Sequence, residues 1–109
     1  MRTAQDIHPP PVAAEYARDV RSRLGSHVRQ IILFGSQARG DAGSHSDYDF
    51  VVVLDERTRE LRNAVLDAGG SLLEEQGELC AALVYDSDQW EQVRHSPLGW
   101  NIERDGIVI

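Results

Sequence analysis

The hydrophobic positions of the chain recur at intervals that predict alternating helices and strands. In the first predicted helix, four apolar residues recur at every fourth position: Val12, Tyr16, Val20 and Leu24. This spacing places them on one helical face, and Gly25 directly after the last of them predicts the end of the helix. Three consecutive prolines precede the helix, and we expect them to exclude regular structure before them. We therefore expect residues 1–11 to form a flexible arm and residues 12–109 to form a single domain.

Two short apolar runs predict buried strands in the middle of the chain. The strand expected at 28–34 ends in Ile-Ile-Leu-Phe, and the strand expected at 50–54 reads Phe-Val-Val-Val-Leu. Each run is too short for a helix and is rich in residues that favour strands. Between them the sequence predicts a short helix at 36–39 and a polar loop at 41–46.

The second half of the chain predicts a long helix, a third strand and short closing elements. Apolar residues with helical spacing run through 55–76, so we expect one helix that is weakened at Gly69-Gly70; a break at this pair is the alternative. A strand is expected at 79–85, and Ser87 is expected to cap a helix at 88–94. The closing elements are a turn or helix at 97–102, a turn at 104–106 and a strand at 107–109. This order predicts an α/β sandwich with a mixed sheet and helices packed mainly on one face.

Composition narrows the class of protein. The 109 residues, 41% hydrophobic and 27% charged, suit one globular domain. No apolar run approaches the roughly 18 residues of a membrane-spanning helix, and the first residues lack the apolar core of a signal peptide. The single cysteine, Cys80, cannot form an internal disulfide, which is consistent with the cytoplasmic location that we expect. We expect Cys80 to be a small buried residue of a strand rather than a nucleophile.

The charge of the chain limits its partners. The net charge is −7, and all basic side chains are arginines. An acidic surface disfavours extended nucleic-acid binding, which depends on many contacts with phosphates. It favours a small anionic ligand bound through a metal ion, or a basic protein partner. The absence of lysine excludes a P-loop, because that motif needs one.

Two aspartates open the second buried strand. Because side chains alternate along a strand, Asp47 and Asp49 lie on one face and Tyr48 lies on the other. Neighbouring carboxylates repel each other, and a divalent cation relieves the repulsion. Mg²⁺ binds one or two carboxylates together with waters and substrate phosphates. The pair therefore predicts one side of a site for one or two Mg²⁺ ions.

The bend that ends the first buried strand supplies candidate phosphate ligands. Gly35 allows the backbone to approach a bulky anion closely, and the Ser36 hydroxyl can donate a hydrogen bond to phosphate. Arg39 lies one helical turn further on, and its planar guanidinium suits phosphate oxygens.

Gly35-Ser36, ten residues and then Asp47-Tyr48-Asp49 resemble the Gly-Ser-x10-Asp-x-Asp signature of the DNA polymerase β-like nucleotidyltransferase superfamily. The fuller runs, 34–41 and 46–50, are similar to the minimal nucleotidyltransferases of prokaryotes, and a looser similarity continues to residue 108. The resemblance implies the polymerase β-like fold and transfer of a nucleotide, with ATP as substrate. It also implies two Mg²⁺ ions bridged by the aspartate pair, with phosphates held by the Gly-Ser bend.

The sequence departs from this family in one respect. The family usually places a third carboxylate on the third strand, where it binds the metal that activates the acceptor. Here the middle of that strand, 79–84, contains no acid. Glu78 is the candidate replacement as a metal ligand, and a solvated charge at the strand end is the alternative. Without a replacement, nucleotide binding could persist while transfer becomes slow or absent.

The resemblance also implies a partner. Minimal nucleotidyltransferases are commonly encoded beside a helical HEPN-family toxin, as the antitoxin half of the pair, and they adenylylate a hydroxyl of that toxin. The first hypothesis is therefore an adenylyltransferase antitoxin. The second is a degenerate module that neutralises its partner by binding alone. The third is transfer of a nucleotide to a small molecule or RNA.

Overall fold

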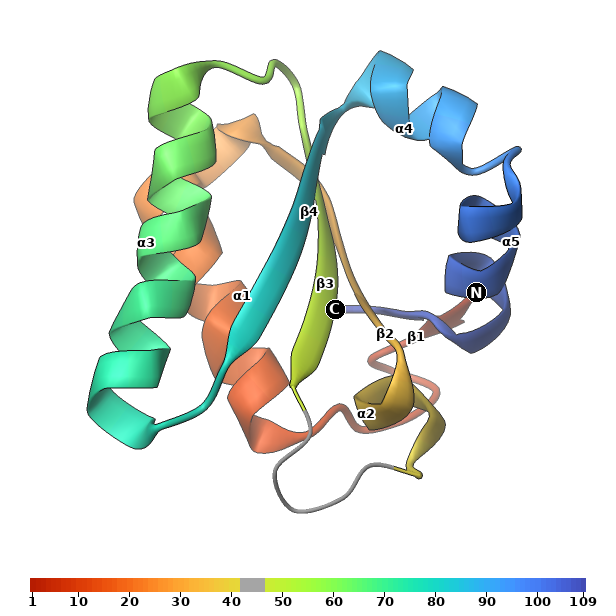
Figure 1. The fold of residues 1–109 in the computed structure, drawn as a ribbon, viewed down its shortest axis with the longest axis horizontal. Helices are drawn as coiled ribbons and strands as arrows, with labels where there is room; N and C mark the ends of the chain where they lie inside the picture. The colour runs from red at the N-terminus through yellow and green to blue at the C-terminus, as the bar shows by residue number, and fades with distance from the viewer. Residues whose placement is uncertain (42–46) are drawn as a thin grey trace.

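A computed structural model of the protein describes residues 1–41 and 47–109, which form one mixed sheet with helices on both sides (Figure 1). The strands are β1 (Arg2–Thr3), β2 (Val28–Phe34), β3 (Tyr48–Leu54), β4 (Cys80–Asp86) and β5 (Ile107–Val108). The α-helices are α1 (Pro11–Leu24), α2 (Ser36–Arg39), α3 (Arg59–Gln76), α4 (Ser87–Val93) and α5 (Pro97–Asp105), and a 3₁₀ turn, η1 (Gly25–His27), follows α1. The loop predicted at 41–46 falls almost entirely on residues 42–46, outside the described residues.

The sheet has the strand order β1-β5-β2-β3-β4. Strands β2 and β3 are antiparallel to each other, whereas β3 and β4 are parallel. The parallel pair is connected by α3, as parallel strands require a crossover. Because β2 and β3 lie inside the sheet and are covered on both faces, their apolar runs need no polar alternation. Strand β4 forms one edge of the sheet.

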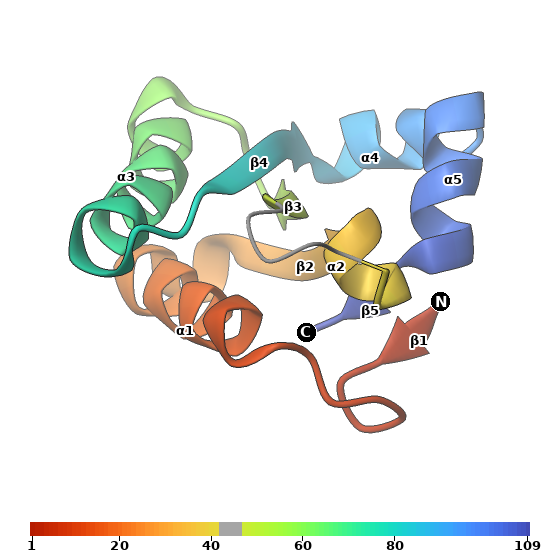
Figure 2. The same cartoon turned by 60° about the horizontal axis from the view of Figure 1, so that its bottom comes forward.

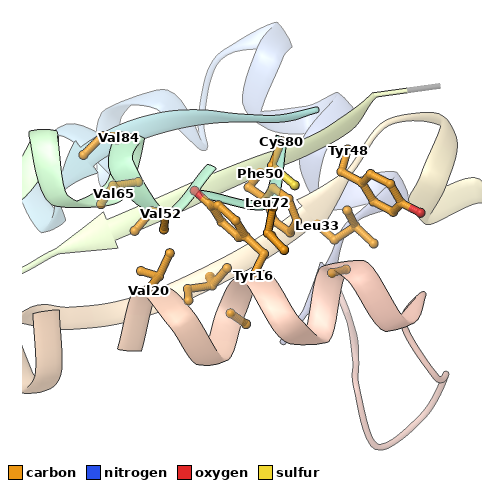
Figure 3. Packing of buried hydrophobic residues seen from close by; sticks show 14 of the residues in the cluster. Tyr16, Val20, Leu33, Tyr48, Phe50, Val52, Val65, Leu72, Cys80 and Val84 are labelled. Atoms are coloured by element: carbon orange, nitrogen blue, oxygen red, sulfur yellow. The ribbon is translucent and has the colours of Figure 1, made fainter. Parts of the chain in front are cut away.

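The two long helices, α1 and α3, cover one face of the sheet (Figures 1 and 2). Tyr16 of α1 stacks on Phe50 of β3 with ring centroids 4.1 Å apart, and Figure 3 shows this pair at the centre of the core between helix and sheet. Even-numbered residues of β3, such as Val52, point to this face together with Cys80 and Val84 of β4. The apolar residues that recur along the first helix are therefore the ones that α1 buries against the sheet.

The short helices α4 and α5 cover part of the opposite face (Figure 2). Trp90 of α4 and Ile102 of α5 pack with Ile32, Val51 and Val53 of the sheet. The mixed sheet with helices mainly on one face is confirmed, with this smaller second cluster as an addition. None of the helices in the described part of the chain is long and apolar enough to cross a membrane.

Helix α3 continues without a break through Gly69-Gly70. A Cβ at Gly69 would lie 2.9 Å from the carbonyl oxygen of Cys80, whereas a Cβ at Gly70 would meet nothing within 4 Å. Gly69 thus lets the helix lie close against β4. The prediction of one helix is confirmed, and the first glycine of the pair has a packing reason.

The expectation that the prolines exclude regular structure before them is wrong. Arg2 and Thr3 form β1, which pairs in parallel with β5, and the Ala4 amide donates to the Val108 carbonyl at 2.8 Å. The prolines restrict only their own neighbourhood, and Pro11 is the first residue of α1. The backbone before them therefore remains free to pair with the last strand.

Several boundaries differ from expectation: α3 begins at Arg59 rather than 55, β3 begins at Tyr48 rather than 50, and the ends of α4 and α5 differ as well. Asp86, not Ser87, caps α4: its carboxylate accepts from the Gln89 amide at 2.7 Å, and the Gln89 side chain accepts from the Asp86 amide at 3.0 Å. The Ser87 hydroxyl instead donates to the Leu54 carbonyl. Helix α5 extends to Asp105, where the sequence predicted a turn, because the helical backbone hydrogen bonds continue to Gly106.

Candidate active site

The two aspartates lie where β3 begins. Asp49 is the register partner of Phe34, the last residue of β2. Along the strand it alternates to the same side as Val51 and Val53, which pack on the α4–α5 face. Tyr48 belongs to the core on the opposite face, under α1 and α3. Asp47 directly precedes the strand and is exposed. Burial raises the pKa of Asp49 above its usual value, and the Asp47 carboxylate raises it further. The two acids are therefore close enough to repel each other, with the inner one partly withdrawn from water.

The bend after β2 touches the inner acid. Gly35 has φ 76° and ψ −159°, a conformation that only glycine adopts readily. A Cβ at this position would lie 2.6 Å from Oδ2 of Asp49. The Asp49 carboxylate thus occupies the space that the missing side chain leaves. The Gly-Ser bend and the aspartate pair, twelve positions apart in sequence, form one surface.

Ser36 begins α2 directly after this bend. The carbonyl of Gly35 accepts from the amides of Ala38 and Arg39, both at 3.1 Å, which closes the helical turn. The Ser36 hydroxyl makes no hydrogen bond with any residue that the structure describes. It is half-buried and available to an incoming ligand.

Arg39, by contrast, is already engaged. Its Nε donates to Asp41 and its Nη1 donates to Asp105, each at 3.1 Å. These two hydrogen bonds raise the pKa of the guanidinium above its usual value. The residue expected to bind phosphate is held by two carboxylates, one of which belongs to the end of α5.

Two residues outside the predicted site complete the support of α2. Asp105, with a side chain that is 13% exposed, accepts from both Arg39 and Arg104. Arg2 of β1 donates to the carbonyls of Ala38 and Asp105, which ties α2 to the end of α5. The similarity of the C-terminal run to minimal nucleotidyltransferases was an available signal for Asp105. No pattern in the sequence pointed to Arg2.

The position beside Asp49 on β4 is an alanine. Asp49 is in register with Ala81, which is exposed. Glu78 precedes β4. Burial raises the pKa values of Tyr48 and Cys80, and the Glu78 charge raises them further. Both of these residues belong to the α1–α3 face. The geometry therefore favours a charge at the strand end for Glu78, and its role as a metal ligand stays a prediction.

Cys80 is buried, as expected, with 8% of its surface exposed. Burial, with a smaller contribution from Glu78, raises the pKa of its thiol to about 11. At neutral pH the residue is a protonated thiol, and thiols react as nucleophiles through the thiolate.

The donor set suits a metal ion that arrives with a nucleotide. Among residues 1–41 and 47–109, no three acidic, histidine or cysteine side chains converge to hold a metal ion by themselves. Asp47 and Asp49 supply two hard oxygen ligands whose mutual repulsion a cation would relieve. Mg²⁺ ordinarily completes such a site with waters and substrate phosphates. The residues present therefore fit Mg²⁺ bound together with a triphosphate.

Comparison with known proteins decides the family. Residues 14–105 match the family described as the nucleotidyltransferase domain. The chain belongs to this family. A relative in Methanocaldococcus jannaschii, provisionally named a protein adenylyltransferase, is 30% identical over 91 residues, which cover 84% of this chain and 83% of the relative. The resemblance inferred from Gly35-Ser36 and the aspartate pair is confirmed, and the protein is an enzyme of the nucleotidyltransferase type.

Solved structures share the fold of this nucleotidyltransferase. A nucleotidyltransferase from Sulfolobus solfataricus superposes with a TM-score of 0.57 at 22% identity, covering 89% of this chain and 75% of that one. A toxin–antitoxin complex with AMP-PNP gives 0.57 at 18% identity, covering 86% and 68%. A variant of the MntA–HpeT toxin–antitoxin pair with two aspartate-to-glutamate substitutions gives 0.58 at 15% identity, covering 88% and 70%.

Proposed function

We propose that this nucleotidyltransferase is a Mg²⁺-dependent adenylyltransferase that transfers AMP from ATP to a hydroxyl of a HEPN-family toxin, and that it thereby acts as the antitoxin. The observation that carries the proposal is the contact between the Gly-Ser bend and Asp49. It would unite a turn that binds phosphate with a pair of carboxylates that bind metal. The acceptor is argued from the relative named as a protein adenylyltransferase and from the toxin–antitoxin proteins of the same fold.

In the proposed reaction, the acceptor oxygen attacks the α-phosphorus of ATP. The bond from that phosphorus to the oxygen bridging the β-phosphate breaks, pyrophosphate leaves, and the hydroxyl proton passes to solvent. Asp47 and Asp49 would hold Mg²⁺, two ions in the arrangement that the family resemblance implies. Bound there, the metal supplies neutralisation of the triphosphate and polarisation of the acceptor oxygen. The protein contributes chiefly by fixing the positions of the reactants.

The remaining residues of the site orient the phosphate chain. The missing side chain of Gly35 lets Asp49 lie against the bend, directly before Ser36. The Ser36 hydroxyl, which has no hydrogen bond with the described residues, donates one to the phosphate chain. Arg39 binds the triphosphate by exchanging one of its two carboxylate partners for phosphate oxygens. Such an exchange keeps the guanidinium paired with charge throughout, which limits the cost of removing it from water.

The proposal is tested by incubating the protein with ATP labelled at the α-phosphate, Mg²⁺ and the product of the neighbouring gene. We expect label on the partner and a mass increase of one AMP. EDTA should abolish transfer, as should the paired substitution Asp47→Asn and Asp49→Asn. Persistence of full transfer in that double variant would refute the assignment of the two aspartates.

A second candidate function rests on Ala81. An alanine stands beside Asp49, where the family usually has its third acid. If transfer is absent for that reason, the protein would neutralise its partner by forming a complex with it. The same double variant separates the two functions in cells that express the toxin. Unchanged protection by the Asp-to-Asn variant supports binding alone, whereas loss of protection with an intact complex supports transfer.

A further inference from the structure

Part of the outer edge of strand β4 is open, with backbone groups that have no partner in the described part of the chain. The amide of Tyr48 donates to the carbonyl of Leu79 at 2.9 Å, so the odd-numbered residues of β4 face β3. The amides and carbonyls of Ala82 and Val84 therefore point away from the sheet, and neither residue has a backbone partner on that side among the residues that the structure describes. Toward the start of the strand the edge is closed, since Gly69 of α3 lies against the carbonyl of Cys80. The open stretch is thus short and begins after Ala81.

A shallow groove follows this open stretch. One hollow of about 200 Å³ is lined by Arg57, Arg62 and β4 residues 82–85. A second, of about 250 Å³, continues from it past Arg57 to Gln89 of α4. Leu83 adds an apolar side chain that is 37% exposed. The groove therefore combines free strand backbone, apolar surface and amide donors.

Two uncommitted positive charges border the groove. The guanidinium groups of Arg57 and Arg62 make no ion pair or hydrogen bond with any residue in the described ranges. The chain as a whole carries a net charge of −7, so two unpaired guanidinium groups at one groove contrast with its overall charge. The charge that complements them is a carboxylate. A second copy of this chain fits poorly, because pairing two β4 edges about a two-fold axis would bring the arginines of both copies together.

We propose that the β4 edge binds an extended segment of the acceptor protein, rich in acidic residues, as a sixth strand of the sheet. Backbone hydrogen bonds to Ala82 and Val84 would give affinity, and Arg57 and Arg62 would select carboxylates. Neighbouring strands lie about 4.8 Å apart, so the added strand would lie roughly 10 Å from β3. Asp49 is in register with Ala81, a small exposed residue directly before the open stretch. A long side chain at the end of the added strand would then carry its hydroxyl over Ala81 to the nucleotide.

This inference rests on the proposed function, which identifies the acceptor as the partner protein. Binding of that partner is therefore measured separately from the transfer of AMP. The probe is the partner protein used in the transfer assay, titrated calorimetrically at fixed salt. Ala82→Pro removes the outward amide without breaking the ladder to β3, since proline is tolerated at such edge positions. Ala82→Val is its control, because it enlarges the side chain and keeps the amide. Arg62→Glu reverses one groove charge, and Arg18→Glu, on α1, is the matched reversal elsewhere.

We expect Ala82→Pro and Arg62→Glu each to weaken binding by about tenfold or more, with both controls within about twofold. Amide hydrogen exchange at Ala82 and Val84 should slow in the complex. Full affinity of the two test variants would overturn the inference and leave the proposed transfer intact. Edge-dependent binding without AMP transfer would instead refute the proposed function and leave the inference standing. Self-association of the protein that Ala82→Pro abolishes would assign the edge to a second copy and overturn the inference.

Discussion

At the scale of single residues, Gly35 joins the two halves of the site. Replacing Gly35 by alanine adds a Cβ that collides with Asp49, in addition to straining the backbone. We expect Gly35→Ala to lower transfer by about 100-fold or more, since such positioning effects are of this size, while the protein remains folded by circular dichroism.

The matched control for that substitution is Gly25→Ala. Gly25 has a similar backbone conformation, φ 58° and ψ −128°, but a Cβ there meets nothing within 4 Å. Both variants should lose about 1–2 kcal/mol of stability from the positive φ. Only Gly35→Ala should lose activity. Equal activity in the two variants would show that the contact with Asp49 is not needed for catalysis.

Cys80 offers a pH-dependent test of burial. Its thiol pKa of about 11, against 9.0 for the ordinary thiol, leaves about 100-fold less thiolate at pH 8. Alkylation by iodoacetamide should therefore be at least about 100-fold slower in the native protein than in urea, and it should accelerate as the pH rises toward 11. The labelling rate is followed by mass spectrometry. A native rate equal to that in urea would contradict the buried position.

The sequence was informative at this scale where the relevant pattern was local. A glycine before a short helix predicts the bend at Gly35, which the structure has. The shared face of Asp47 and Asp49 stays a prediction, since Asp47 directly precedes β3. The pairing of Arg39 with Asp105 spans 66 positions and leaves no periodic signal. Arg2 acts on backbone carbonyls, which any residue type presents, so its partners could not be read from residue identity.

At the scale of elements, the two adjacent glycines of α3 should respond in opposite ways to alanine. Gly70→Ala fills open space in a helix interior and should raise the free energy of unfolding by about 1 kcal/mol. Gly69→Ala should lower it, because its Cβ would lie 2.9 Å from the Cys80 carbonyl and push the helix from β4. Urea denaturation of both variants measures the difference. A stabilising Gly69→Ala would contradict the close packing of α3 on the sheet.

Long elements were predictable from the sequence and their ends were not. The apolar runs of β2 and β3 fit only strands, and the helical spacing of α3 is long enough to fit only a helix. Asp86 and Ser87 are both good helix caps, and only the reciprocal bonds with Gln89 decide between them. Strand β1 has two residues and exists because β5, at the other end of the chain, lies beside it. Such a short element has no periodicity of its own.

At the scale of the whole molecule, the first residues brace the site. Arg2 hydrogen-bonds the ends of α2 and α5, so Arg2→Ala should lower stability by about 1–3 kcal/mol. It should also raise the KM for ATP more than it lowers kcat, because α2 carries Ser36 and Arg39 but not the aspartates. Arg18→Ala removes an exposed side chain that has no hydrogen bond or ion pair with the described residues. It should change stability by less than about 0.5 kcal/mol. If Arg2→Ala and Arg18→Ala changed stability and the KM for ATP equally, Arg2 would have no special role in supporting α2.

The alanine beside Asp49 on β4 also bears on how this enzyme evolves. Any alanine codon becomes an aspartate or glutamate codon when its second base changes from C to A. The gene therefore lies one point mutation away from a protein with a third carboxylate next to the pair. Transfer rate could rise or fall among natural lineages by that single step, with the fold and the edge of the sheet unchanged.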